Sequence, residues 1–564
     1  MITEKLGELL TNVAKTCGYD DTFTVILSNR PELCDYQSDT AFQLAKKYHK
    51  APMMIGTEIV DALKKIDNFE SYFKEVSFAA PGFINVSLSD TFIKEKLVDM
   101  MNHEKFHLKQ PEQVKTFVLD YGGPNVAKPL HVGHMRTAIV GESIKRIINY
   151  VGHKTISDVH LGDYGLQIGQ VIYGVLQDQK DINDITLEYL EDIYPKMSAL
   201  CKEDDEIKEK CAAITKSLQD GDPTYRELWK VILEISGNDI KRLYRYLDVS
   251  FDLWQGESDA YKYIAPTEEI LHEKGLIEDS EGAKVVKVKS EEDTKEVPPL
   301  IWQKSNGAYL YGTTDLATIY EREHRFHPDY ICYVVDNRQN LHFEQVFRVA
   351  KKAGITDANL EFLGYGTVNG EDGKPYKTRS GNTPKLDGLF EQTKEIFLSK
   401  KEENKEKNDE DIRKIVNAIL KFADLQNSRE RDYIFDIHKF SNTVGKTGPY
   451  ILYTYLRIDK ILKQVEVPTS LSSQIYNETD RNLRLKLLEL EKVILAAFHE
   501  RKPNIIADYI YQLSDLANSF YQNNHLANLE DQQKKNDWLY VLTLTNKVLK
   551  EMLFLIGIEI PTFM

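Results

Sequence analysis

The chain has 564 residues, with 72 Lys and Arg against 88 Asp and Glu, and a formal net charge of -16 at pH 7. This length exceeds what one hydrophobic core usually organises, so we expect two to four domains. The negative charge excludes a protein that coats nucleic acid without selectivity, although a local basic surface can still bind RNA.

The sequence shows no sign of a membrane or secreted protein. No apolar run approaches the roughly 18 residues that a membrane span needs, and the first residues lack the charged and apolar regions of a secretory signal. The cysteines, at 17, 34, 201, 211 and 332, form no CxxC pair. Neither a zinc knuckle nor a disulfide framework is therefore expected, and we expect a reduced, cytoplasmic protein without a metal site of its own.

Residues 1–105 have the pattern of a small α+β domain. Helical periodicity covers 2–15, 40–49 and 55–66, and strand-like runs follow at 76–78 and 83–88. Pro81-Gly82 lies between the two runs, as in a turn that joins two strands.

A strand, a turn and a helix follow from Thr116. The apolar run 116–121 precedes Gly122-Gly123-Pro124-Asn125, and a helical pattern with apolar residues at Val140, Ile144 and Ile148 leads to a second strand-like run at 154–160. In a βαβ unit the turn and the helix N-terminus lie at the carboxyl edge of a parallel sheet, where phosphates bind.

His131-Val132-Gly133-His134 opens this helix. Two histidines three residues apart share one face of the first turn. They can donate hydrogen bonds to one phosphate in its transition state. An HxxH pair by itself is more often a metal-binding pair or a chance occurrence.

The rest of the chain divides into two parts. Residues 171–255 are strongly helical and charged, which predicts an insertion, and strand and helix patterns resume at 316–324, 330–335, 343–352 and 360–364. The charged run 400–411 is typical of a solvated linker. Beyond it, periodic runs at 483–499, 505–520 and 538–556 predict a helical bundle. The predicted domains are 1–105, 106–395 with the insertion at 171–300, and 396–564.

Residues 124–136, PNVAKPLHVGHMR, resemble the first signature of class I aminoacyl-tRNA synthetases, and the flanking residues are similar to the arginyl-tRNA synthetase family, with a subclass Ia character. The resemblance implies an α/β fold. The implied fold has a Rossmann-like parallel-sheet catalytic domain with a helical insertion, an N-terminal α+β domain that contacts tRNA, and an all-α anticodon-binding bundle. It further implies ligation of L-arginine to its tRNA with ATP and Mg²⁺, activation that requires bound tRNA, and a monomer.

The same resemblance assigns the residues that handle ATP. His131, His134 and Lys128 are the expected catalytic residues, and Gly133 is expected close to the nucleotide. The second class I signature, KMSK, appears only in degenerate form as KPYKTRS at 374–380. Lys374, Lys377 and Arg379 are its candidate phosphate contacts. Because no KMSK sequence is present, Lys128 is expected to supply the positive charge of the missing lysine.

A guanidinium group is a planar fork of donors that carboxylates and a hydroxyl can hold in its plane. The resemblance implies that Tyr311 and Asp315 form this clamp, with Glu257 as a second acid. The remaining expected arginine ligands are Asp120, Asn125 and Gln339. Without the resemblance, a Tyr/Asp pair is an ordinary start of a solvated helix.

Tyr450, Tyr453 and Arg457 are candidates for RNA contact, because tyrosines beside arginine can stack on unpaired bases. An amphipathic helix that buries its tyrosines explains the same pattern. Two other functions remain open. One is another class Ia synthetase such as the cysteinyl type, whose metal-ligating cysteines are absent from this sequence. The other is a catalytically inactive relative that senses RNA or arginine.

Overall fold

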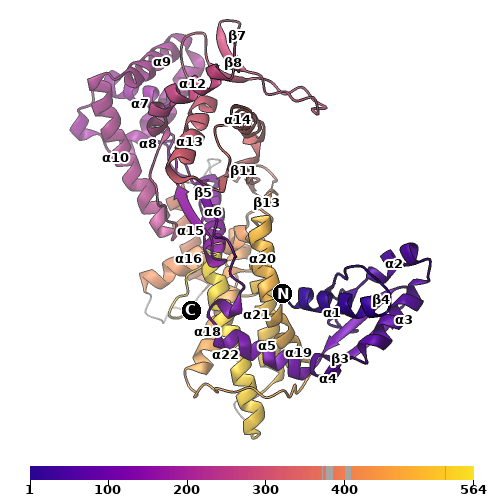
Figure 1. Ribbon diagram of the computed structural model, residues 1–564. Helices are drawn as coiled ribbons and strands as arrows, with labels where there is room; N and C mark the ends of the chain where they lie inside the picture. The colour runs from indigo at the N-terminus through magenta and orange to yellow at the C-terminus, as the bar shows by residue number, and fades with distance from the viewer. Residues whose placement is uncertain (371, 377–384, 401–407, 527–528) are drawn as a thin grey trace. The chain divides into compact units, whose positions relative to one another are not determined.

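The computed structural model describes residues 1–370, 372–376, 385–400, 408–526 and 529–564. It divides into two compact units (Figure 1). The first comprises Met1–Lys109, Ile451–Ala496 and Asp508–Met552, and the second comprises Gln110–Tyr450, Ala497–Ala507 and Leu553–Met564.

The second unit is built on a parallel sheet with the strand order β11-β10-β5-β6. Its strands are β5 (Thr116–Tyr121), β6 (Lys154–Asp158), β10 (Tyr330–Val334) and β11 (Asn359–Phe362). Strand β5 is central and pairs with β6 and β10 in parallel register. Its burial on both faces explains the continuous apolar run from which it was predicted.

Helix α6 (Val132–Tyr150) crosses from β5 to β6 and contacts both strands and β10. Gly141 brings it close to the sheet, because a Cβ atom there would lie 2.2 Å from the ring of Tyr121. Helices α13 (Tyr311–Phe326) and α14 (Asn340–Ala353) pack on each other beside the sheet. Their apolar faces share a buried core with Val118 and Ile331.

The segment between β6 and β10 holds the insertion. It contains α7 (Leu166–Gln177), α8 (Leu187–Glu203), α9 (Asp205–Asp220) and α10 (Pro223–Tyr246), which lie together in Figure 1. The short helices α11 (Glu257–Ala260), η3 (Tyr261–Tyr263) and α12 (Ile264–Glu273) follow. An antiparallel sheet of β7 (Ile277–Ser280), β8 (Ala283–Val286) and β9 (Leu300–Gln303) completes it.

After the parallel sheet, β12 (Val368–Asn369) pairs with β13 (Tyr433–Ile434). Helices α15 (Leu386–Ser399) and α16 (Asp409–Leu425) lie between these two strands in the sequence, and α17 (Ile437–Phe440) comes after β13. The last elements are α18 (Gly448–Leu462), α19 (Glu478–Leu488), α20 (Leu490–Glu500), α21 (Asn504–Asn523) and α22 (Gln532–Leu555). They form the predicted helical C-terminal part. Most of the charged run 400–411 lies outside the described residues.

The first unit contains an antiparallel sheet of order β1-β2-β4-β3. Its elements are α1 (Ile2–Thr16), β1 (Ile26–Leu27), β2 (Tyr36–Ser38), α2 (Thr40–Tyr48), α3 (Pro52–Leu63), α4 (Phe69–Tyr72), β3 (Phe73–Ala79), β4 (Phe83–Leu88), α5 (Asp90–Asn102) and η1 (Glu104–His107). The predicted turn at Pro81-Gly82 joins β3 to β4. Arg481 of α19 forms ion pairs with Asp35 at 2.7 Å and Asp90 at 3.0 Å, which ties the helical part of this unit to its sheet.

The predicted fold class is confirmed: a parallel-sheet α/β domain, an N-terminal α+β domain and a helical C-terminal part. No helix in the described ranges combines the length and apolarity needed to cross a membrane.

Candidate active site

A cleft of about 590 Å³ opens at the carboxyl edge of the parallel sheet. Ligands of open α/β sheets bind at this edge. Ten of the residues singled out from the sequence line the cleft, from segments far apart in the chain: Asp120, Asn125, Lys128, His131, Gly133, His134, Glu257, Tyr311, Asp315 and Gln339. The structure therefore brings the expected phosphate-binding and arginine-binding residues into one cavity.

The two histidines of the HVGH motif also cap helix α6. His131 is the N-cap residue, and its Nδ1 accepts a hydrogen bond from the backbone N–H of Gly133 at 3.1 Å. The Nδ1 of His134 accepts one from the backbone N–H of His131, also at 3.1 Å. Because both Nδ1 atoms act as acceptors, the proton of each neutral ring is on Nε2.

The charge state of these rings follows from their surroundings. Burial, followed by the positive charge of Lys128, lowers the pKa of His131 to about 4. Burial, followed by the neighbouring His131, lowers the pKa of His134 to about 3. The ring centroids are 4.0 Å apart. At neutral pH the motif thus presents two adjacent neutral N–H donors.

Gly133 leaves room for one of these rings. A Cβ atom at Gly133 would lie 3.0 Å from Cε1 of His131 and 3.1 Å from its Nδ1. In the structure, then, the missing side chain makes space for the His131 ring that caps the helix.

The chain before the motif is fixed by the loop after β6. The N–H of Val126 donates to the carbonyl of Gly162 at 3.0 Å, and the N–H of Gly162 donates to the carbonyl of Pro124 at 3.1 Å. A Cβ atom at Gly162 would lie 2.1 Å from Oδ1 of Asn125. The glycine is therefore required for Asn125 to occupy its place in the cleft.

Asp120 has a partner within the protein. Its Oδ2 lies 2.6 Å from Nη2 of the buried Arg322, which also contacts Oδ2 of Asp158 at 2.9 Å. His160 lies beside them, with Nδ1 3.4 Å from Asp158. Burial alone would lower the pKa of His160, but the carboxylates of Asp158 and Asp120 raise it to about 9. Asp120 is thus part of a buried charge network that also lines the cleft.

Asp315 and Glu257 present carboxyl groups to the same cavity. Oδ2 of Asp315 accepts a hydrogen bond from Nε2 of His342 at 2.5 Å. Burial by itself lowers the pKa of His342, and the Asp315 carboxylate outweighs that effect and raises it. Burial raises the pKa of Glu257 to about 8, with a further contribution from the charges of Asp163 and Asp315.

Tyr311 and Gln339 complete the predicted arginine residues. Tyr311 is the first residue of α13, one turn before Asp315, so the two side chains share a helix face. Gln339 lies in η4 (Asn337–Gln339), immediately before α14. Both side chains are exposed to the cleft from its rim.

The degenerate second signature is only partly described. Lys374 follows β12, and its carbonyl accepts from Gly370 N–H at 2.8 Å; it is not among the residues that line the cleft. Lys377 and Arg379 lie outside the described residues.

Lys385 pairs with His131 in an antiparallel bridge, and the N–H of Leu386 donates to the carbonyl of Leu130 at 2.8 Å. The chain that follows the second signature therefore lies directly beside the first.

The candidate RNA-binding residues lie on α18. The Arg457 guanidinium is 4.6 Å from the ring centroid of Tyr453 and 5.6 Å from that of Tyr521. Tyr453 is 44% exposed and Tyr521 is 38% exposed, so these rings are accessible to a base. Tyr450 lies near the start of the same helix and is half-buried.

Several cleft residues were missed by the sequence analysis. His160, Tyr333, Asp336, Arg338, His342 and Tyr365 line the cavity as well. Arg338 is paired with Asp336 through bonds of 2.8 and 2.7 Å. Asp336 and His342 could have been suspected, because they follow β10 at the edge where ligands bind.

Family models match nearly the whole chain. The model described as "tRNA synthetases class I (R), catalytic domain" matches residues 96–437, "Arginyl tRNA synthetase N terminal domain" matches 2–88, and "DALR anticodon binding domain" matches 451–564. The cleft and its paired histidines thus belong to a class I aminoacyl-tRNA synthetase.

Individual relatives agree. The chain is 42% identical over 586 residues to an arginine–tRNA ligase of Alkaliphilus oremlandii, with 100% of this chain and 99% of the relative covered. The crystal structure of arginyl-tRNA synthetase from Plasmodium falciparum superposes with a TM-score of 0.81 at 26% identity, covering 100% of this chain and 99% of that one. The Thermus thermophilus arginyl-tRNA synthetase shares the fold, with a TM-score of 0.82 at 20% identity and full coverage of both chains. The chain belongs to the arginyl-tRNA synthetase family.

Proposed function

We propose that both steps of arginine–tRNA ligation take place in the cleft at the edge of the parallel sheet. The observation that carries this proposal is the pair of neutral Nε2–H donors of His131 and His134, which share one cavity with the carboxyl groups of Asp315 and Glu257. One half of the cavity suits a phosphate, and the other suits a guanidinium group.

In the first step a carboxylate oxygen of arginine attacks the α-phosphorus of ATP. A new P–O bond forms, the bond from the α-phosphorus to the bridging oxygen of the β-phosphate breaks, and pyrophosphate leaves. No protein nucleophile is needed, so catalysis depends on positioning and on stabilisation of phosphoryl charge. His131 and His134 donate from Nε2 to the α-phosphate oxygens, and Lys128 adds a positive charge.

Arginine is selected by its guanidinium group. Asp315 and ionised Glu257 accept its N–H donors, and Tyr311 contributes a hydroxyl. Asn125 binds the α-carboxylate or α-ammonium end, Asp120 contributes charge at that end, and Gln339 closes the rim. Asp120 does so together with Arg322, because the two are joined in the buried network.

ATP enters with Mg²⁺ bound to its phosphate oxygens, as is usual for nucleotides. The lining fits an ion that would arrive with the substrate rather than one held by the protein. Asp336, which could otherwise serve as a metal ligand, is already paired with Arg338. Lys374, Lys377 and Arg379 neutralise the departing pyrophosphate, and Gly133 keeps the backbone near the nucleotide open.

In the second step a hydroxyl of the terminal ribose of tRNA attacks the carbonyl carbon of arginyl-adenylate, and AMP leaves. Tyr450, Tyr453 and Arg457 contact the RNA, and bound tRNA is required for the first step. The chain acts as a cytoplasmic monomer, with domains at 1–105, 106–395 and 396–564.

Arginine-dependent exchange of pyrophosphate into ATP, with and without a tRNA that carries an arginine anticodon, tests this proposal. Exchange only in the presence of the tRNA is the expected result. Exchange without tRNA contradicts the proposed coupling, and binding of arginine without any exchange would favour the inactive sensor.

A further inference from the structure

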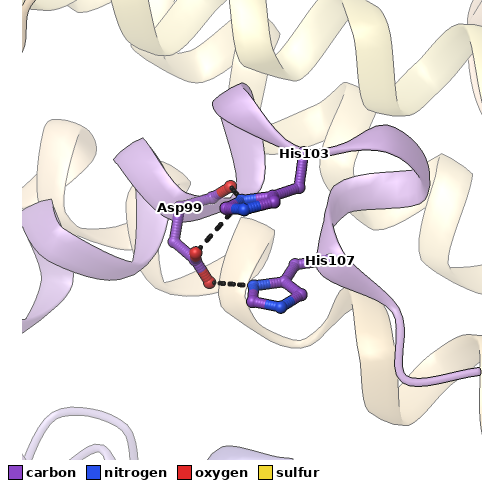
Figure 2. A group of neighbouring side chains, drawn as sticks. All are labelled: Asp99, His103 and His107. Atoms are coloured by element: carbon purple, nitrogen blue, oxygen red, sulfur yellow. Dashed lines mark hydrogen bonds and ion pairs between the residues drawn. The ribbon is translucent and has the colours of Figure 1, made fainter.

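Two histidines and an aspartate meet at the end of α5 in the first unit (Figure 2). Asp99 lies in the last turns of the helix, His103 directly follows it, and His107 ends η1. These residues do not line the arginine cleft, and the proposed function gives them no role.

The three side chains converge on one point. Nδ1 of His107 lies 2.7 Å from Oδ2 of Asp99, and Nδ1 of His103 lies 3.2 Å from Oδ1. The ligand atoms of all three residues lie within 4.8 Å of one another. The two rings are stacked, with centroids 4.3 Å apart and an interplanar angle of 21°. Figure 2 shows both rings turned toward the same carboxylate.

An unusual turn places His107 in this cluster. Lys105, Phe106 and His107 have φ angles of 50°, 56° and 61°, so three successive residues other than glycine adopt the left-handed region. L-residues disfavour this conformation. The turn folds the chain back over the end of α5, and a linkage between His107 and Asp99 would stabilise it.

We propose that Asp99, His103 and His107 bind one divalent transition-metal ion, with Zn²⁺ as the expected ion. Two imidazoles and one carboxylate form a donor set that zinc accepts, whereas Mg²⁺ and Ca²⁺ prefer oxygen ligands. Ligand atoms around a tetrahedral zinc lie about 3.3 Å apart, given bond lengths of about 2.0 to 2.1 Å. The separations of 2.7 and 3.2 Å between the imidazole nitrogens and the carboxylate are somewhat shorter than that value. Nδ1 of His103 also lies 2.8 Å from the backbone carbonyl oxygen of Asp99 and would exchange that contact for the ion.

The exposure of the site determines its character. The side chains of His103 and His107 are 52% and 57% exposed, so water can complete the coordination. Lys5, Lys96 and Lys109 line an adjacent cavity of about 250 Å³ together with Asp99 and His107. Their positive charges reduce the attraction for a cation, so we expect weaker binding than at a closed structural zinc site.

The ion would link η1 to α5, the last two elements of the N-terminal α+β part of the chain. It would hold the left-handed turn closed. The site is therefore a structural one, and arginine ligation does not depend chemically on its ion.

Metal titration of the full chain tests the proposal. After removal of metals with a chelator, Zn²⁺ binding is measured by calorimetry, and Co²⁺ is used as a spectroscopic probe of the ligands. Asp99→Asn, His103→Ala and His107→Ala should each weaken binding at least ~10-fold, because loss even of a group that only orients a ligand has an effect of that size. His272→Ala is the matched control, since that exposed histidine also lies beside a carboxylate, with Nε2 3.6 Å from Glu268, but is not part of a three-residue cluster among the described residues.

The cysteines are the main competitors for zinc. Sγ of Cys201 and Sγ of Cys211 are 3.6 Å apart, and thiolate ligation would give Co²⁺ an intense charge-transfer band. Binding that survives in the three variants but is lost in Cys201→Ser overturns the proposal, and so does the absence of any binding by the wild-type chain.

Backbone protection gives a second readout. Zn²⁺ should slow amide hydrogen exchange at 103–108 in the wild-type chain and leave exchange in His107→Ala unchanged. Equal exchange with and without Zn²⁺ in the wild-type chain would contradict the proposed link between η1 and α5.

Discussion

His342 donates a hydrogen bond from Nε2 to Oδ2 of Asp315 at 2.5 Å. The carboxylate that we assign to the arginine guanidinium therefore has a donor of its own, which lies in the first turn of α14 and holds the carboxylate in place. This pairing raises the pKa of His342. The arginine guanidinium would therefore enter a site in which the Asp315 carboxylate already has a partner, and the carboxyl group of Glu257 lines the same cavity.

Asp315→Asn should weaken the use of arginine far more than the use of ATP. The variant leaves the guanidinium facing a neutral amide, and truncation of one partner of a buried charge pair costs about 2–5 kcal/mol. The kcat/KM values for arginine and for ATP in the exchange reaction are the measurement. Glu323→Gln, on the same helix but outside the cleft lining, is the control. Equal losses for both substrates would place Asp315 outside the arginine site.

Arginine binding near pH 7 should release a proton from Glu257. Its pKa of about 8 means that the carboxyl group is largely protonated at this pH, and a guanidinium nearby favours the ionised form. Calorimetric titration in buffers with different ionisation enthalpies measures the number of protons released. Glu257→Gln should abolish the buffer dependence. A wild-type binding enthalpy that is the same in all buffers would show that Glu257 does not ionise on binding.

The same residue should make the chain less stable as the pH rises. The pKa of Glu257 is higher in the folded chain, at about 8, than the ordinary value of 4.5. The folded state thus binds more protons between these values, so the free energy of unfolding falls across this range. In Glu257→Gln the decrease in the free energy of unfolding between pH 5 and pH 9 should be smaller by roughly 2 kcal/mol. This is less than the whole pKa difference of Glu257 corresponds to, because water in the cleft screens its charge. Urea unfolding at pH 5 and pH 9 compares the two chains, and parallel pH profiles would refute this contribution.

Replacements of His134 should separate its two roles. The amide oxygen of Asn can occupy the position of Nδ1 and keep the hydrogen bond with His131, but it offers no donor at the position of Nε2. His134→Asn should therefore preserve stability and slow adenylate formation by about 3 kcal/mol. His134→Gln should keep more activity and lose about 1 kcal/mol of stability, because it gives up the cap. Exchange rates with tRNA present and thermal unfolding are the two measurements. A wild-type rate in His134→Asn would remove His134 from the reaction.

Tyr453 should contribute to RNA binding through its ring rather than its hydroxyl. Stacking of a base on an aromatic ring contributes about 1–3 kcal/mol. Tyr453→Ala should raise the KM for tRNA accordingly, whereas Tyr453→Phe should leave it nearly unchanged, and Arg457→Gln should resemble the alanine variant. Lys460→Ala, an exposed residue on the same helix, is the control. Equal effects of Tyr453→Ala and Lys460→Ala would favour a purely structural role for the tyrosine.

The elements with a strong pattern could be predicted from the sequence. Strand β5 has the predicted bounds, because Phe117, Val118, Leu119 and Tyr121 are all buried in a central strand and give it a clear apolar run. Strands β1 and β2 were missed, since two or three residues carry no period. The antiparallel sheet at 277–303 was also missed: exposed edge strands such as β7 have few apolar residues.

The helical run predicted at 483–499 is two helices, α19 and α20, interrupted at Glu489. Both halves keep one apolar periodicity, so the pattern continues across the break.

The candidate site was predicted as far as local motifs and resemblance reach. The HVGH motif indicated the phosphate half, but the capping hydrogen bonds that fix its tautomers depend on backbone geometry. The network of Arg322 with Asp120 and Asp158 joins residues from three elements, and nothing in their spacing indicates it. The roles of the individual site residues stay predictions until the variants are measured.

The hydrogen bonds that cap α6 limit what a protein engineer can place at the HVGH motif. Lysine and arginine are stronger donors to phosphate, but neither offers an acceptor for the backbone N–H groups of His131 and Gly133. A gain in charge at either position would leave a backbone donor at the start of α6 without its present acceptor. Redesign of the nucleotide half of this enzyme must therefore keep an acceptor for the backbone at the start of α6 together with a donor toward the phosphate, and at position 134 asparagine and glutamine each supply only one of the two.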